Sequence, residues 1–187
     1  SAASDVYKRQ VKYAKKTSSP LVYDLCSGSG CIGISIAKAV PQSDVYCVEK
    51  SADAMAYLLK NAQGIQNVHA VSGDVLNTAS FENIRENSID IIVSNPPYIK
   101  SSEIEGLQRE VQFEPREALD GGADGLEFYT YIAREWKKYL KPNGILLFEI
   151  GNEQADEVAC LLETNGYKNI EIKNDMYGNP RIAASQK

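Results

Sequence analysis

The chain has 187 residues, 43% hydrophobic and 24% charged, enough apolar side chains for the core of one domain. Its formal net charge is -5, whereas proteins that bind a phosphate backbone usually present a basic face. The composition therefore disfavours an RNA or DNA substrate and favours a small molecule or a protein. Since the sequence has neither an apolar run of membrane-spanning length nor a signal-peptide pattern, we expect a cytoplasmic protein with no membrane partner.

The four cysteines show no Cys-x-x-Cys pair, and the single histidine, His69, is far from most of them in sequence. No metal site is therefore predicted, and we interpret the cysteines as reduced thiols, mostly buried. The first ten residues are unusual, because residues 5–10 (Asp-Val-Tyr-Lys-Arg-Gln) resemble a translated transposase adapter. We interpret residues 1–10 as non-native and residues 11–187 as one catalytic domain; the alternative is a short polar N-terminal helix.

Strand-like and helix-like segments alternate from about residue 21. The predicted strands are residues 21–26, 45–49, 67–71, 89–94, 144–150, 169–173 and 181–185, and the predicted helices are residues 31–40, 51–62, 126–140 and 153–165. This alternation predicts βαβ crossover units, and hence an α/β, Rossmann-like fold with a mostly parallel seven-stranded sheet covered by helices on both faces. The polar stretch of residues 95–125 is predicted to be a long functional loop.

A glycine-rich loop follows the first predicted strand: Asp24-Leu25-Cys26-Ser27-Gly28-Ser29-Gly30-Cys31-Ile32-Gly33. Glycines let the backbone approach a ligand closely, and the start of the next helix offers free N–H groups. Glu49, about twenty residues further on, can hold ribose hydroxyls. The loop alone does not separate NAD from S-adenosylmethionine (SAM), because both present an adenosine to this crevice.

Two aspartates favour SAM. Asp24, four residues before Gly28, resembles the acidic residue that opens motif I of class I SAM-dependent methyltransferases. A carboxylate there suits the cationic methionine end of SAM and would repel a pyrophosphate. Asp74 matches the position beside the adenine in that fold, with Val75 against the ring. The alternatives are that Asp24 caps the following helix and that Asp74 belongs to a solvent-facing turn.

The tetrapeptide Asn95-Pro96-Pro97-Tyr98 directly follows the fourth predicted strand, where an open α/β sheet forms its ligand crevice. The Asn95 side-chain oxygen and the Pro96 carbonyl can accept from the two N–H groups of a planar amino group, and Tyr98 offers a flat face for stacking. Two acceptors help such a poor nucleophile, because they stabilise the positive charge that develops as it attacks a methyl group. The tetrapeptide therefore predicts N-methylation of an amide or a ring amino group.

With these motifs, the sequence resembles the HemK/PrmC family of release-factor glutamine methyltransferases over about residues 23–184. The similarity includes residues 113–126 (Phe-Glu-Pro-Arg-Glu-Ala-Leu-Asp-Gly-Gly-Ala-Asp-Gly-Leu), 149–151 and 175–181. The resemblance implies methylation of the glutamine in the Gly-Gly-Gln motif of a peptide release factor, with SAM as cofactor, S-adenosylhomocysteine as product, and nucleic acid only in a ribosome-associated context. The implied site residues are Asn95, Pro96, Pro97 and Tyr98 for the amide, and Asp24, Cys26, Ser27, Gly28, Ser29, Gly30, Glu49, Asp74, Val75 and Asn95 for the cofactor.

The family also carries an N-terminal helical domain that helps to bind the release factor, and this sequence shows none. Glu49 stands where aspartate is more usual, and Val75 where a larger residue often covers the adenine. Alternative functions stay open: methylation of a base amino group, which uses a similar tetrapeptide; a SAM-binding module without catalysis; and an NAD-dependent dehydrogenase. The acidic pI of about 5.0 counts against methylation of a base. The intact tetrapeptide counts against a module without catalysis, and the lack of a hydride-transfer constellation counts against a dehydrogenase.

Overall fold

The computed structural model describes residues 10–81, 83–109 and 111–187. Its strands are β1 Leu21–Leu25, β2 Asp44–Glu49, β3 Val68–Ser72, β4 Ile89–Ser94, β5 Leu140–Glu149, β6 Lys168–Asn174 and β7 Pro180–Gln186. Its α-helices are α2 Cys31–Ala39, α3 Ala52–Asn61, α4 Arg116–Leu119, α5 Glu127–Glu135 and α6 Ala155–Thr164. The 3-10 helices are η1 Thr78–Phe81, η2 Ile104–Gly106, η3 Val111–Phe113 and η4 Trp136–Tyr139.

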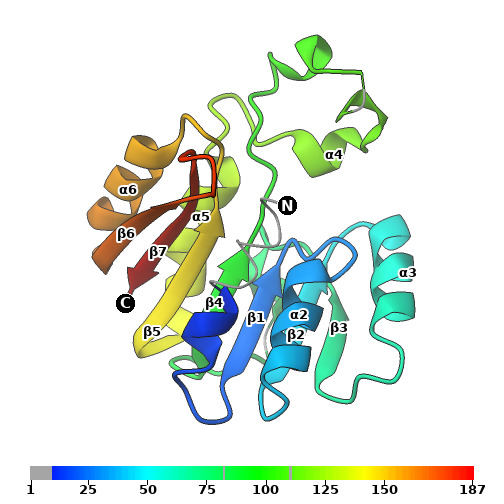
Figure 1. Ribbon diagram of the computed structural model, residues 1–187, viewed down its shortest axis with the longest axis vertical. Coiled ribbons are helices and arrows are strands. Elements are labelled where there is room, and N and C mark those ends of the chain that lie inside the picture. The colour runs from blue at the N-terminus through cyan, green and yellow to red at the C-terminus, as the bar shows by residue number, and fades with distance from the viewer. Residues whose placement is uncertain (1–9, 82, 110) are drawn as a thin grey trace.

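The strands form one seven-stranded sheet in the order β3-β2-β1-β4-β5-β7-β6. β1 to β5 pair in parallel, while β7 is antiparallel to both β5 and β6. The sheet confirms the predicted Rossmann-like α/β fold. Because the chain reverses its strand order between β1 and β4, the loops after these two neighbouring strands meet at the same edge of the sheet (Figure 1).

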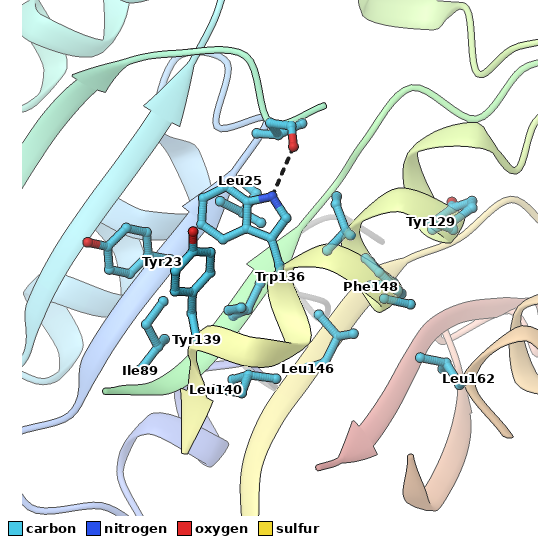
Figure 2. Close-up of a cluster of buried hydrophobic side chains, with 14 of the residues drawn as sticks. Tyr23, Leu25, Ile89, Tyr129, Trp136, Tyr139, Leu140, Leu146, Phe148 and Leu162 are labelled. Carbon is cyan, nitrogen blue, oxygen red and sulfur yellow. Dashed lines mark hydrogen bonds between the residues drawn. The ribbon is translucent and has the colours of Figure 1, made fainter. Parts of the chain in front are cut away.

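Two hydrophobic clusters cover the two faces of the sheet. On one face, α2 and α3 pack through residues such as Ile36 and Leu58 against Val22 and Val45. On the other face, α5, η4 and α6 pack against side chains such as Leu25. Successive residues of β1 alternate between the two clusters, as the period of a β-strand requires. Figure 2 shows the second cluster, in which Trp136 lies among Tyr23, Tyr139 and Leu25.

Two predicted boundaries in the second half of the chain are wrong. The predicted helix of residues 126–140 ends at Glu135 and continues as η4, and β5 begins at Leu140 instead of residue 144. The predicted helix and strand leave residues 141–143 between them, but Leu140 already pairs with Ile89, and the ladder resumes where Ile145 pairs with Ile91. The strand is therefore irregular over residues 141–144, where the backbone of Asn143 is left-handed (φ 67°).

Residues 95–125 are more ordered than the predicted loop. They contain η2, η3 and α4 and form a lobe beyond the carboxyl ends of the strands (Figure 1). The base of the lobe is closed by a short parallel bridge between Ile99 and Asp120, with Ile99 N–H donating to the Leu119 carbonyl (2.9 Å) and Gly121 N–H donating to the Ile99 carbonyl (2.8 Å). The predicted functional segment is thus a folded element whose two ends are joined.

Residues 1–9 lie outside the described residues, and so does nearly all of the segment interpreted as non-native. Gln10, the first described residue, is buried and begins a helical turn of residues 10–14. In the described part of the chain, no helix has both the length and the apolar character needed to cross a membrane.

Candidate functional site

The glycine loop connects β1 to α2 through three residues in the left-handed region, Cys26 (φ 56°), Gly28 (φ 55°) and Gly30 (φ 82°). Gly30 N–H donates to the Ser27 carbonyl (2.8 Å), which closes the turn. A Cβ at Gly30 would lie 2.4 Å from Leu58 Cδ1, so a side chain fits neither the backbone conformation nor the space. The loop is therefore held in one shape, with the start of α2 directly behind it.

Glu49 joins this loop to the end of β2. Its Oε2 accepts a hydrogen bond from Gly28 N–H (2.7 Å), and its Oε1 accepts one from Ser51 N–H (2.8 Å). Ser51 in turn caps α3, as predicted, by accepting from Ala54 N–H. The half-buried carboxylate therefore has a fixed orientation, and its remaining lone pairs face the cavity described below.

Asp24 is fully buried, and its Oδ2 accepts from Gly33 N–H (2.8 Å) in the first turn of α2. This contact is the capping interaction that the sequence left open, whereas a cofactor contact stays a prediction. Its Oδ1 is buried without a hydrogen-bond partner among the described residues. Burial raises the pKa of Asp24 to about 7; the Gly33 hydrogen bond opposes the shift, and the nearby charge of Glu49 adds to it.

A cavity of about 720 Å³ lies at the carboxyl ends of the strands, between the glycine loop and the lobe. Most of the predicted site residues line it: Cys26, Ser27, Gly28, Ser29, Glu49, Asp74, Val75, Asn95 and Pro97. Four do not belong to its wall: Asp24, Gly30, Pro96 and Tyr98. The structure therefore brings together two motifs that are almost seventy residues apart in the sequence.

Asp74 and Val75 form the wall that follows β3. Lys50 Nζ lies 2.8 Å from Asp74 Oδ2, and Leu76 N–H donates to Asp74 Oδ1 (2.9 Å). Burial alone raises the pKa of Asp74, but the two hydrogen bonds and the charge of Lys50 outweigh it, so the pKa lies below its usual value. The buried Trp136 Nε1 donates to the Val75 carbonyl (2.9 Å; Figure 2), which ties this wall to the hydrophobic core.

The Asn-Pro-Pro-Tyr loop begins where β4 lies beside β1. Ser94 is fully buried, and its Oγ donates to the Leu25 carbonyl (2.7 Å). This hydrogen bond joins the ends of β4 and β1, from which the Asn-Pro-Pro-Tyr loop and the glycine loop begin. Asn95 is exposed to the cavity, and Pro97 is buried in its wall. Tyr98 is half-buried outside the wall, and burial raises the pKa of its hydroxyl. The tetrapeptide thus presents Asn95 to the space that the glycine loop faces.

Sequence reasoning missed several residues of this site. Phe128 and four carboxylates line the cavity, together with Lys50 and Ser101; the carboxylates are Glu114, Glu117 and Asp120 of the lobe and Glu127 of α5. Gln154 lies behind the tetrapeptide and donates to the Tyr98 carbonyl (3.0 Å). The four carboxylates fall within or next to residues 113–126, the block that resembles the HemK/PrmC family, so this resemblance could have indicated them as site residues. Gln154 had none, since a single Gln before a helix is unremarkable.

Comparison with known proteins places this geometry among methyltransferases. Residues 10–122 match the family model described as methyltransferase small domain. A release factor glutamine methyltransferase of Clostridium acetobutylicum is 40% identical over 92% of this chain and 61% of its own length. One of Thermodesulfovibrio yellowstonii is 38% identical over 89% of this chain and 59% of its own length. A ribosomal protein uL3 glutamine methyltransferase of Francisella tularensis is 38% identical over 71% of this chain and 42% of its length.

The chain therefore spans about three fifths of the length of the first two relatives. Solved structures agree on the fold. TrmN from Thermus thermophilus has a TM-score of 0.65 at 18% identity, covering 97% of this chain and 48% of its own. A SAM-dependent methyltransferase from Aquifex aeolicus has a TM-score of 0.63 at 16% identity, covering 96% of this chain and 88% of its own.

Proposed function

This chain belongs to the methyltransferase small domain family, and we propose that it transfers a methyl group from SAM to the side-chain amide nitrogen of the glutamine in the Gly-Gly-Gln motif of a peptide release factor. One observation carries the proposal: Asn95 and Pro97 line the same cavity as Gly28 and Glu49. Two relatives that match most of the chain have names that specify a release factor glutamine, and another has a name that specifies a ribosomal protein glutamine.

The residues of the cavity fit SAM. Its volume, about 720 Å³, falls within the range of small-molecule sites. Ser27 lines the cavity, and its buried Oγ has no hydrogen-bond partner among the described residues, so a polar ligand atom would satisfy it. The Glu49 carboxylate suits two ribose hydroxyls, and Val75 offers an apolar contact for an adenine. Bound SAM supplies an electrophilic methyl group; binding and orientation come from this chain.

Asn95 and the tetrapeptide backbone would hold the acceptor. We assign the Asn95 side-chain oxygen and the Pro96 carbonyl as the two acceptors for the NH₂ group of the glutamine side chain. An amide nitrogen is a poor nucleophile because its lone pair is delocalised, and two acceptors stabilise the positive charge that develops on it. A fixed loop also supplies alignment, and Pro96 and Pro97 restrict the backbone here. No strong base is needed, because the methylated cation readily loses a proton to water.

Charge supports a protein substrate over a nucleic acid. Residues 98–127, which comprise most of the lobe and the start of α5, contain eight acidic residues and three Lys or Arg, a net charge of -5 that equals the charge of the whole chain. Four of these carboxylates, Glu114, Glu117, Asp120 and Glu127, line the cavity. They would repel a phosphate backbone approaching the acceptor side. A release factor substrate also agrees with the predicted cytoplasmic location.

The test is methyl transfer from labelled SAM to a purified release factor, with mass spectrometry to locate the methyl group. We expect the label on the Gly-Gly-Gln glutamine and none when that glutamine is replaced by glutamate. The Asn95→Ala variant should keep its melting temperature while its turnover falls by about a hundredfold, the range for loss of one charge-stabilising group. Label on uL3 or on nucleic acid, and none on the release factor, would contradict the proposed substrate.

A further inference from the structure

One buried amide side chain connects three separate segments behind the acceptor loop. Gln154, only 8% exposed, immediately precedes α6. Its Nε2 donates to the Tyr98 carbonyl (3.0 Å) and to the Gly125 carbonyl (3.1 Å), while its Oε1 accepts from Gly151 N–H (3.2 Å). These partners lie after β4, at the end of the lobe and after β5, so their relative position depends on Gln154.

The joint around Gln154 is closely packed. A Cβ at Gly125 would lie 2.5 Å from the Tyr98 carbonyl oxygen and 2.9 Å from Gln154 Nε2. A Cβ at Gly151 would lie 2.7 Å from Gln154 Oε1 and 3.2 Å from Tyr98 Cδ2. Gly125, whose φ is 74°, therefore accepts only glycine, whereas a side chain at Gly151 would displace the Gln154 amide. The backbone of Gln154 is fixed as well, because Val158 N–H donates to its carbonyl (2.9 Å).

The hydrogen-bonding pattern at this joint requires an amide. Its partners are two carbonyl acceptors and one N–H donor, and Gln matches them with two N–H donors and one oxygen. Without those donors, two carbonyl groups would be left in an interior where unsatisfied acceptors are costly. A glutamate of the same shape would keep the contact to Gly151 but place a charged oxygen against the carbonyls of Tyr98 and Gly125.

We propose that Gln154 is a positioning residue for methyl transfer: it sets the place of the Asn95–Tyr98 loop relative to the lobe and thereby controls acceptor binding and turnover. The inference rests on the proposed function. Gln154 does not line the cavity, and its hydrogen bonds reach neither the glycine loop nor Glu49. Its effect should therefore fall mainly on the acceptor side, and the affinity for SAM, which we assign chiefly to the glycine loop and Glu49, should change little.

Gln154→Glu tests this through its pH dependence. Burial and two facing carbonyls raise the pKa of a glutamate at this place, so lowering the pH from about 8.5 to about 6 increases the fraction that is neutral. The neutral form donates one hydrogen bond, whereas the ionised form donates none. We expect acceptor kcat/KM to be about a hundredfold below wild type at the higher pH and to recover severalfold at the lower pH. Calorimetry should give a SAM Kd within about twofold of wild type.

Asn67→Asp is the matched control, since the Asn67 amide likewise donates to two carbonyls, those of Ala37 and Ser43, at the opposite end of the sheet. It should lower the melting temperature without a pH-dependent change in acceptor kcat/KM relative to wild type. Gln154→Met, which keeps the length without hydrogen bonds or charge, should lower kcat/KM about tenfold at every pH. If Gln154→Glu does not fold, Gln154→Met still tests the positioning role, and an unchanged kcat/KM for this variant would contradict it.

Hydrogen exchange gives a readout that needs no acceptor. The amides of Ile99 and Gly121, which bond across the base of the lobe, should exchange faster in the Gln154 variants, and the amides of residues 26–30 should not. Unchanged exchange at Ile99 and Gly121 would overturn the positioning role whatever the substrate. If exchange at Ile99 and Gly121 is faster in the variants but the wild-type protein methylates no glutamine, the positioning role stands and only the proposed function is contradicted.

Discussion

Glu49 accepts hydrogen bonds both from the glycine loop, at Gly28, and from Ser51, the residue that caps α3. Glu49→Ala should weaken SAM binding by about 1.5–3 kcal/mol, the range for hydrogen bonds to a charged group, because the ribose acceptor is lost and the Gly28 turn is released. Calorimetric titration with SAM measures this change. Asp53→Ala, at an exposed carboxylate in the first turn of α3, should leave the affinity unchanged. An unaltered Kd for Glu49→Ala, or tighter binding of NAD than of SAM, would refute the cofactor assignment.

Asp24 should make the stability of the chain depend on pH. Its pKa is 3.8 as a free group and about 7 in the fold, so the unfolded state loses the proton first as the pH rises. The contribution of Asp24 to stability is therefore complete below about pH 4 and is lost on going up to about pH 7. Asp24→Asn should remove this slope, and thermal unfolding at a series of pH values measures it. The exposed Asp156→Asn serves as control; equal slopes for wild type and Asp24→Asn would argue against a buried, protonated Asp24.

At the scale of elements, η4 supports the cavity wall that follows β3 through the indole of Trp136. Trp136 is fully buried, and its Nε1 donates to the Val75 carbonyl (Figure 2). Trp136→Phe keeps an aromatic ring but leaves that carbonyl buried without a donor, which should lower the free energy of unfolding by about 1–3 kcal/mol, plus a packing loss from the smaller ring. Urea denaturation measures the stability. The SAM Kd of the folded variant should also rise, and an unchanged Kd would mean that the wall keeps its shape without the hydrogen bond.

At the scale of the whole molecule, the size of the substrate matters. The resemblance to the HemK/PrmC family implies a helical domain before the catalytic domain that helps to bind the release factor, which stays a prediction for this chain. Fusing such a domain from the Clostridium acetobutylicum relative should chiefly lower the apparent KM for the release factor, by about tenfold or more, because anchor residues contribute ~2 kcal/mol or more each. Turnover should change little, since the cavity is unchanged. Steady-state kinetics of the chain with and without the fusion measures both constants, and a fusion that raises kcat alone would contradict this role.

The sequence by itself determined the fold class and the place of the two central motifs. Hydrophobic periodicity acts over a few residues, so it could be read without knowing any distant contact. The glycine loop after β1 and the Asn95–Tyr98 loop after β4 were predicted for the same reason, because turn residues mark the end of a strand locally. Their meeting at one edge followed from the parallel order of the strands.

Only the tertiary structure decided how individual side chains are used. The motif leaves a capping role for Asp24 open, and the packing of α2 on β1 decides that this carboxyl is buried and accepts from Gly33 N–H. The predicted helix of residues 126–140 covers Leu140, yet this residue already pairs with Ile89 of β4, and the pairing resumes at Ile145 after the irregular segment of residues 141–144. Gln154 acts on Tyr98 and Gly125, 56 and 29 residues away, and no local pattern encodes such contacts. Each of these outcomes depends on which distant groups the fold brings within hydrogen-bonding distance, because a buried polar atom takes whatever partner the packing offers it.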